Sequence, residues 1–286
     1  ILLLTIHHIV GDIWSIWQLL DEVRVLYPAA RSGVTATLPP LNFSYAAHIE
    51  QQRQMLAGAE GERLWQYWQQ QLAGPLPVLA LPTDRPRPAI QTFHGATERF
   101  HLTTTQTQQL KQLAQAEGVT LYTLLMAAFQ ALLYRYTNQA EIIVGSPTAG
   151  RQQAQMINVV GYFVNPVVVR SHVSSAATFK ALLDQVRQTV LGAITHQAYP
   201  FPLLVERLQP ERDPSRSPLF QVAFLMQQPQ QRGLVDLMVA DGAGERVNWG
   251  GLWLEPYTIP QQEGQFDLTL EVMEARATLY GLFKYN

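Results

Sequence analysis

The stretch HHIVGDIWS, residues 7–15, says more about the fold and chemistry of this chain than any other part of it. It follows the apolar run 1–6, which predicts a buried strand, and it precedes apolar residues at helical spacing. This context places two imidazoles and the carboxylate of Asp12 at a strand-to-helix turn. An imidazole held there can remove a proton from an attacking amine or alcohol. The same residues also suit a plain structural turn, in which Asp12 caps the helix.

Length and composition narrow the class of protein. The 286 residues are 47% apolar, which is enough for one large domain or two modest ones. A net charge of −2, with no face rich in Lys and Arg, argues against a nucleic-acid partner. The absence of cysteine excludes disulfides, thiol catalysis and cysteine-bound metals. The longest apolar run is too short to span a membrane, so we expect a cytoplasmic protein without a membrane span.

Hydrophobic periodicity predicts a mixture of helices and strands, and therefore an α/β or α+β fold. One helix is expected from Asp12 to a loop at 28–40, and one or two surface helices, broken near Gly58 and Gly61, at 45–72. Further helices are expected at 105–116, 120–136, 179–194 and 203–208. Strands are expected at 1–6, 97–102, 142–144, 162–170, 220–226, 251–254, 266–273 and 278–285, the last two as a hairpin, and a loop at 227–248. The proline-rich segment 74–88 predicts an extended linker and the best internal boundary.

Other kinds of chemistry find little support in the sequence. His7 and His8 are adjacent, which is a poor arrangement for chelating one ion, and no HExxH motif is present, so no metal site is expected. No GxGxxG or Walker loop appears, which argues against nucleotide binding. Ser15 is not interpreted as a nucleophile, because no GxSxG elbow surrounds it.

Six motifs, in order, resemble those of the condensation domains of non-ribosomal peptide synthetases. The HHIVGD stretch is similar to the HHxxxDG of that family, and the resemblance covers nearly the whole chain. The other five are LPTDRPRP within 72–88, GSPTAGR at 145–151, GYFVNPVVVR at 161–170, HQAYPF at 196–201 and RDPSRSPLFQVAF at 212–224. One HHxxxD alone would be a weak signal, whereas six motifs in the family's order are a strong one.

The resemblance implies a fold like that of chloramphenicol acetyltransferase, with two lobes and a tunnel between them. Residues 1–90 would then complete the N-terminal lobe and carry the catalytic turn and the crossover linker, while 91–286 would form most of the C-terminal lobe. Both ends of the domain would be truncated, and we expect the excised chain to be inactive by itself. The implied partners are donor and acceptor peptidyl or acyl carrier domains and an adjacent adenylation domain.

The resemblance also implies roles for individual residues. His8 would face the tunnel and contact the amine of an acceptor aminoacyl thioester, which attacks a donor acyl or peptidyl thioester. Both would be carried on phosphopantetheine arms, with no cofactor bound directly by this chain. His7 would support the turn. Asp12 would form an ion pair that shapes the site, with Arg151 and Arg170 as the candidate partners within the chain. Asn165 would hydrogen-bond across the lobe junction.

Departures from the family pattern keep alternatives open. Ile13 stands where HHxxxDG has glycine, although its backbone N–H remains available for an oxyanion. Pro166, Ala198 and Pro202 also differ from the usual residues, which suggests a fatty-acyl or polyketide-derived donor in a hybrid pathway. A non-catalytic docking module of the same fold is one alternative, and an epimerisation domain and a coenzyme A-dependent acyltransferase are others. The order Trp14-Ser15 favours condensation over epimerisation, and His7 argues against heterocyclisation.

Overall fold

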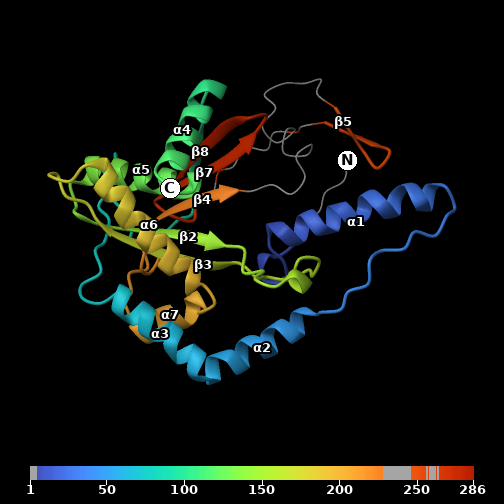
Figure 1. Cartoon of the computed structure of the whole chain (residues 1–286), viewed down its shortest axis with the longest axis horizontal. Helices are drawn as coiled ribbons and strands as arrows, with labels where there is room; N and C mark the ends of the chain where they lie inside the picture. Colours follow the sequence, from blue (N-terminus) through green and yellow to red (C-terminus); the bar gives the residue numbers. More distant parts are fainter. Residues whose placement is uncertain (1–4, 228–245, 256, 258–261, 263) are drawn as a thin grey trace. The chain divides into compact units, whose positions relative to one another are not determined.

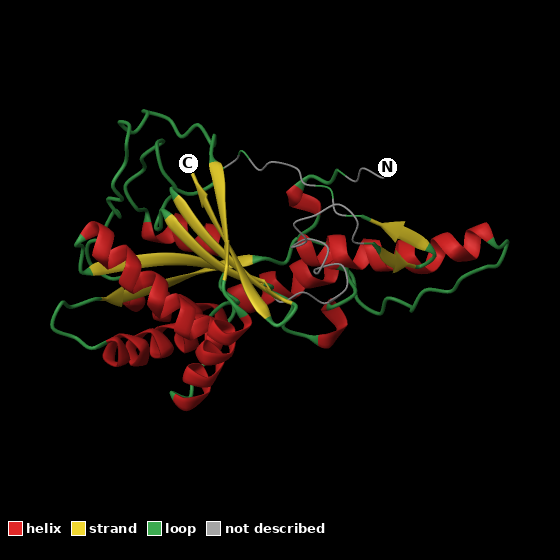
Figure 2. Cartoon of the chain, turned by 90° about the horizontal axis from the view of Figure 1, so that it is seen from above, coloured by secondary structure: helices red, strands yellow, loops and turns green. Residues whose placement is uncertain are grey.

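The structure, a computed structural model, describes residues 5–227, 246–255, 257, 262 and 264–286 (Figure 1). The chain divides into two compact units. Unit 1 comprises Ile1–Arg63, Ala149–Asn165 and Gln230–Thr258, and unit 2 comprises Leu64–Thr148, Pro166–Pro229 and Ile259–Asn286. Helices and strands are intermixed along the chain, as the pattern of the sequence predicts (Figure 2).

Unit 2 contains a six-stranded mixed sheet with strand order β1-β8-β7-β4-β2-β3. β7 and β8 form the predicted antiparallel hairpin, β1 pairs antiparallel with β8, and β4 runs parallel to both β7 and β2. The strands are β1 (Ala96–His101), β2 (Glu141–Thr148), β3 (Asn165–His172), β4 (Val222–Gln227), β7 (Leu268–Ala275) and β8 (Thr278–Tyr285). β3 lies at one end of the sheet order, where Pro166 is tolerated because an edge strand can lack one donor.

Three helices cover one face of this sheet and form the main core with it. They are α4 (Thr104–Ala116), α5 (Leu121–Thr137) and α6 (Phe179–Thr195). The buried cluster joins Leu124 and Phe129 of α5 to Val186 of α6 and to Phe224 of β4. Each helix begins at a threonine whose side chain accepts a hydrogen bond from the first turn, at Thr103, Thr120 and Thr178. The wide apolar stripe predicted for 120–136 is therefore the central helix of the core.

Two more helices belong wholly or partly to unit 2. They are α3 (Ala59–Gln71), whose first residues lie in unit 1, and α7 (Phe201–Leu208). The one or two surface helices expected at 45–72 are α2 (Tyr45–Ala57) and α3; α3 exposes polar residues on one side, while Leu64 and Trp68 on its buried side are each only 1% exposed. The indole Nε1 of Trp68 donates to the carbonyl of His196 at 3.1 Å, which satisfies its polar atom inside the core.

Unit 1 carries the motif HHIVGDIWS. Its described elements are the 3-10 turn η1 (His8–Val10), α1 (Ile13–Arg31), α2 (Tyr45–Ala57), the 3-10 turn η2 (Ala154–Met156) and the hairpin strands β5 (Val247–Trp249) and β6 (Leu252–Leu254). Trp249 of the hairpin is buried against Trp17, Leu20 and Val23 of α1. A second small cluster joins Met156, Val159 and Phe163 to Phe43 and Tyr45.

Several predicted boundaries differ from the structure. Residues 1–4 of the predicted first strand lie outside the described residues, and residues 5 and 6 are not in a strand. α1 continues through Pro28 to Arg31. The strand predicted at 162–170 begins only at Asn165, because the backbone before it bonds to side chains of α1 and its cap. Most of the loop predicted at 227–248 also lies outside the described residues.

Residues 74–88 contain no helix or strand, as predicted, and they lie within unit 2. A division into lobes near residue 90 concerns a complete two-lobed domain, and it stays a prediction. Over the described ranges no single helix is long and apolar enough to cross a membrane. Only α4 and α5 taken together meet that test, across a bend of 102°.

Candidate functional site

The turn before α1 fixes one nitrogen of the His8 ring. The Nδ1 atom of His8 lies 2.9 Å from the carbonyl oxygen of Gly11. Since a carbonyl oxygen only accepts, Nδ1 carries the proton and donates it, and in the neutral ring the lone pair is on Nε2. His7 caps the same turn, because its Nδ1 accepts from the N–H of Ile9 at 3.2 Å. The two histidines thus take different roles: His7 uses its Nδ1 to cap the turn, whereas His8 keeps its Nε2 free of the turn.

The His8 side chain is exposed, and no residue of η1 is buried. A hydrogen-bonded turn therefore holds the imidazole, and residues 5 and 6 before it are not in a strand. One aromatic ring contacts it, that of Tyr162, with the ring centroids 5.2 Å apart and the planes at 77°. Tyr162 itself is 36% exposed, whereas its neighbour Phe163 is buried.

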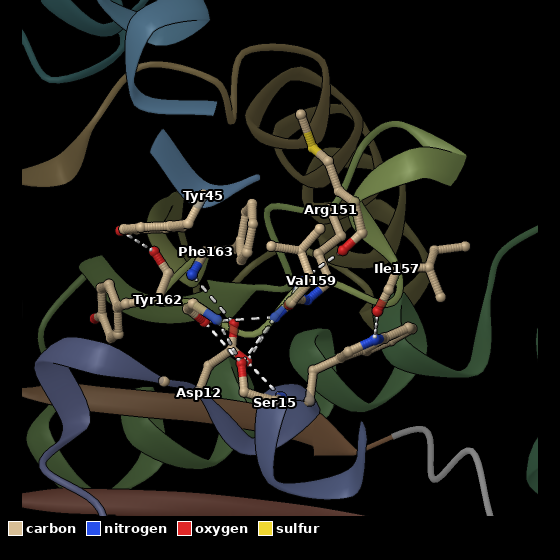
Figure 3. A network of polar contacts seen from close by, with 12 residues as sticks. Asp12, Ser15, Tyr45, Arg151, Ile157, Val159, Tyr162 and Phe163 are labelled. Carbon is tan, nitrogen blue, oxygen red and sulfur yellow. Dashed lines mark hydrogen bonds and ion pairs between the residues drawn. The ribbon is translucent and has the colours of Figure 1, made fainter. Parts of the chain in front are cut away.

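Asp12 lies at the centre of a buried polar network (Figure 3). Its Oδ1 accepts from the N–H and the hydroxyl of Ser15, both at 2.8 Å, and from Arg151 at 2.9 Å. Its Oδ2 accepts from the N–H of Phe163 at 3.1 Å. Asp12 is thus the N-cap of α1 and half of an ion pair at the same time. Both carboxylate oxygens are used for structure, so the group is poorly placed to relay protons.

Arg151 is the partner of Asp12, and both side chains are only 1% exposed. Its guanidinium also donates to the carbonyl oxygens of Met156 and Val159, at 2.7 and 2.8 Å, and lies 4.0 Å above the ring of Phe163. Burial lowers the pKa of Arg151, and the hydrogen bond and charge of Asp12 oppose this. An arginine remains charged nevertheless, so Arg151 always offers its positive charge to Asp12.

Ser15 joins the turn to the segment 161–163. Its buried hydroxyl accepts from the N–H of Gly161 at 3.0 Å and from Arg151 at 3.1 Å, and it lies 2.8 Å from the carbonyl oxygen of Gly161. A hydroxyl has one donor and two acceptor positions. Gly161 and Arg151 fill the two acceptor positions, and the single proton is shared between the carbonyl oxygen of Gly161 and Oδ1 of Asp12, each 2.8 Å from the hydroxyl oxygen. Ser15 was not among the predicted site residues. The available signal was its position three residues after Asp12, which suits a capped first turn.

The segment around Tyr162 is tied to α2 as well. The hydroxyl of Tyr45, the first residue of α2, donates to the carbonyl oxygen of Tyr162 at 2.8 Å. A Cβ on Gly161 would lie 2.3 Å from the ring of Tyr45, so only glycine permits this close approach. On the other side, the indole of Trp14 donates to the carbonyl oxygen of Ile157 at 2.8 Å.

Three other predicted site residues lie elsewhere. Ile13 is the first residue of α1 and is 48% exposed, so its side chain does not disturb the helix start. Asn165 begins β3. Arg170 pairs with Glu141 at 2.9 Å and donates to the carbonyl oxygen of Ala73 at 2.8 Å, both within unit 2. Of the two candidate partners of Asp12, Arg151 has that role and Arg170 does not.

Burial shifts the titration of the aromatic residues around this network. The pKa of Tyr162 is raised by burial and by the charge of Asp12, and the pKa of Tyr45 is raised for the same reasons. The pKa of His48, which packs on Phe163, is lowered by burial and by the charge of Arg151. In the part of the chain that the structure describes, no three His, Asp or Glu side chains gather as a metal site would require.

Comparisons with known proteins agree with this architecture. The family model described as the Condensation domain matches residues 1–286. The chain is 41% identical to a component of the linear gramicidin synthase of Brevibacillus parabrevis, over all of this chain and 4% of that protein. It is 36% identical to the phosphinothricin tripeptide synthetase PhsC of Streptomyces viridochromogenes, over all of this chain and 25% of that protein. The chain therefore spans a quarter or less of these relatives.

Solved structures show the same fold. A four-domain nonribosomal peptide synthetase bound to AMP and glycine superposes with a TM-score of 0.85 at 28% identity, over 98% of this chain and 21% of that one. The X-domain from teicoplanin biosynthesis superposes with a TM-score of 0.81 at 24% identity, over 98% of this chain and 62% of that one, which shows the fold alone. The fold is that of condensation domains, similar to chloramphenicol acetyltransferase. With the whole of its length matched, this chain belongs to the condensation-domain family of non-ribosomal peptide synthetases.

Proposed function

We propose that His8 promotes amide-bond formation between a donor acyl or peptidyl thioester and an acceptor aminoacyl thioester. The observation that carries this proposal is the fixed orientation of the imidazole. Its Nδ1 proton is donated to Gly11, and its Nε2 lone pair belongs to an exposed ring. That nitrogen can accept a proton from the attacking amine or hold the amine in line with the thioester.

The chemical step balances without a further reactant. The acceptor nitrogen forms a bond to the donor carbonyl carbon, which places negative charge on the carbonyl oxygen. The proton lost by nitrogen passes to Nε2 of His8. When the C–S bond breaks, the sulfur of the donor arm takes up a proton and leaves as a thiol. The backbone N–H of Ile13 is our candidate donor for the oxyanion, because the first amides of a helix have no acceptor within it.

The supporting residues act by holding backbone segments in place. His7 caps η1. Asp12 bonds to Arg151 and to the N–H of Phe163, which holds the start of α1 against the segment 151–163. Asn165 and Arg170 are assigned supporting roles at β3, where Arg170 anchors the segment after α3. None of these side chains needs to exchange protons with substrate.

The substrates would arrive on partner domains. Donor and acceptor carrier domains would present them on phosphopantetheine arms, and an adjacent adenylation domain would load the acceptor. The chain would bind no cofactor of its own. The sequence identity of 41% and 36% to synthetases of linear gramicidin and of phosphinothricin tripeptide supports this assignment. A hybrid polyketide-peptide product remains part of the proposal.

A single substitution tests the assignment. In the full-length protein that contains this chain, His8→Ala should lower the single-turnover rate of amide formation by about 10² or more. His94→Ala is the matched control, since it removes an exposed imidazole from unit 2, outside the proposed site, and it should retain the rate. A His8→Ala rate near that of the wild type would exclude His8 as base or positioning residue.

A second candidate is a docking module of the same fold that forms no bond. Ile13, exposed where the family has glycine, is the feature that favours it. It predicts that loaded carriers bind the full-length protein without any product. Ile13→Gly would then restore no activity, whereas an impaired enzyme should become faster. Epimerisation would instead be revealed by inversion at the Cα of an amino acid.

A further inference from the structure

Two contacts set the orientation of the His8 ring. None of the three residues of η1 is buried, so packing in a core does not hold this side chain. The hydrogen bond from Nδ1 to Gly11 ties one ring atom to the turn to which His8 itself belongs, three residues away. A single such bond leaves the ring free to swing about it. The second contact is the ring of Tyr162, which meets the imidazole edge to face and limits that swing.

Three hydrogen bonds hold the backbone around Tyr162. Gly161 before it bonds to the hydroxyl of Ser15, and Phe163 after it donates to Asp12. Its own carbonyl oxygen accepts from the hydroxyl of Tyr45 (Figure 3). The segment that carries the Tyr162 ring is therefore bonded to both α1 and α2. The ring is a fixed surface against which the His8 imidazole packs.

We propose that Tyr162 is a positioning residue for the reaction: its ring holds the His8 imidazole in the orientation that points Nε2 at the acceptor amine. This rests on the proposed function of His8. The contact is made by the ring, so the phenol hydroxyl is not required. Burial and the charge of Asp12 raise the pKa of Tyr162, so the ring stays neutral while the imidazole works.

The rate of the chemical step should report this role, because orientation affects reaction more than binding. In the full-length protein, Tyr162→Leu should lower the single-turnover rate by about 3- to 10-fold, with the KM for the loaded carriers unchanged. Tyr162→Phe keeps the ring and should stay within about twofold of the wild type. Tyr136→Leu, which removes a tyrosine that is 66% exposed on α5, is the matched control.

A double-mutant cycle separates positioning from a general structural effect. If Tyr162 acts through His8, Tyr162→Leu should cost nothing further in a His8→Ala background. The same loss in both backgrounds would overturn the inference, as would a wild-type rate for Tyr162→Leu beside a slow His8→Ala protein. A wild-type rate for His8→Ala would instead overturn the proposed function itself.

Tyr45→Phe covers the case in which Tyr162→Leu fails to fold. It removes only the hydroxyl that bonds to the carbonyl oxygen of Tyr162, so the single-turnover rate should fall by less than in Tyr162→Leu. In a His8→Ala background, Tyr45→Phe should cause no further loss of rate. A Tyr45→Phe protein with the full rate, or one that loses the same factor without His8, would contradict the inference.

Discussion

At the scale of single residues, the site depends on one buried ion pair. Asp12 and Arg151 are 139 residues apart in the sequence and are both almost fully excluded from solvent. A buried pair contributes little net stability relative to apolar residues, but removal of one partner leaves the other charge without its counter-ion. The four hydrogen bonds to Asp12 show that the carboxylate is held for its geometry.

Arg151→Met should therefore destabilise the full chain by about 3 kcal/mol, because it leaves the Asp12 carboxylate buried without its cation. The free energy of unfolding in urea, followed by tryptophan fluorescence, measures this. Arg63→Met removes an arginine whose side chain is 50% exposed, and it serves as the control. The double variant Asp12→Asn with Arg151→Met should recover part of the loss; a fully additive result would show that the two side chains are not coupled.

At the scale of elements, three segments pack closely: the turn before α1, the segment 149–151 and the segment 161–163. Gly150 has φ +67°, and a Cβ there would lie 1.8 Å from the carbonyl oxygen of Phe163. The segment before Arg151 must therefore pass directly beside the segment that carries Tyr162. Gly150 makes this approach possible, whereas Gly161 permits the close approach of the Tyr45 ring of α2 to the same segment.

Gly150→Ala should cost about 2 kcal/mol or more, because both the left-handed φ and the contact with Phe163 oppose a methyl group. Gly118→Ala is a matched control: Gly118 has φ +63° but no atom lies within 4 Å of its Cβ position. Conformational strain alone, about 1 kcal/mol, is expected there. Equal losses in thermal and urea unfolding for the two variants would refute the role of the close contact.

At the scale of the whole molecule, the family motifs serve different parts of the chain. HHIVGD, the last residue of GSPTAGR and the first residues of GYFVN meet in unit 1, whereas HQAYPF and RDPSRSPLFQVAF belong to unit 2. Each unit has an ion pair at a predicted site residue: Asp12 with Arg151 in unit 1, and Glu141 with Arg170 in unit 2.

The stability of the chain should fall in mild acid through His48. Its pKa in the folded chain lies below the ordinary value of 6.5, so the unfolded chain binds the proton more readily. Stability is then unaffected well above pH 6.5 and decreases as the pH falls through that value. His48→Gln should flatten the urea-unfolding free energy between about pH 7 and 5. His94→Gln, at an exposed histidine, is the control and should leave the dependence of the unfolding free energy on pH unchanged. The same unchanged dependence for His48→Gln would contradict the assignment.

The fold class, most of the elements and the family could be predicted from the order of residues alone. Helical and strand periodicity located α4, α5, α6 and the β7–β8 hairpin to within two residues, because these elements bury one regular face. The pattern also selected Asp12 as a helix cap. It could not place the start of β3, since the backbone of 161–163 bonds to side chains that are distant in the sequence.

Three features became visible only in the folded chain: which arginine pairs with Asp12, that Ser15 bridges two motifs, and that Tyr162 lies against His8. Periodicity records which residues are buried, while hydrogen bonds and ring contacts depend on distances set by the packed chain. Arg151 and Arg170 were equivalent candidates in the sequence. They differ because Arg151 follows a loop that passes beside α1, whereas Arg170 lies in a strand beside Glu141.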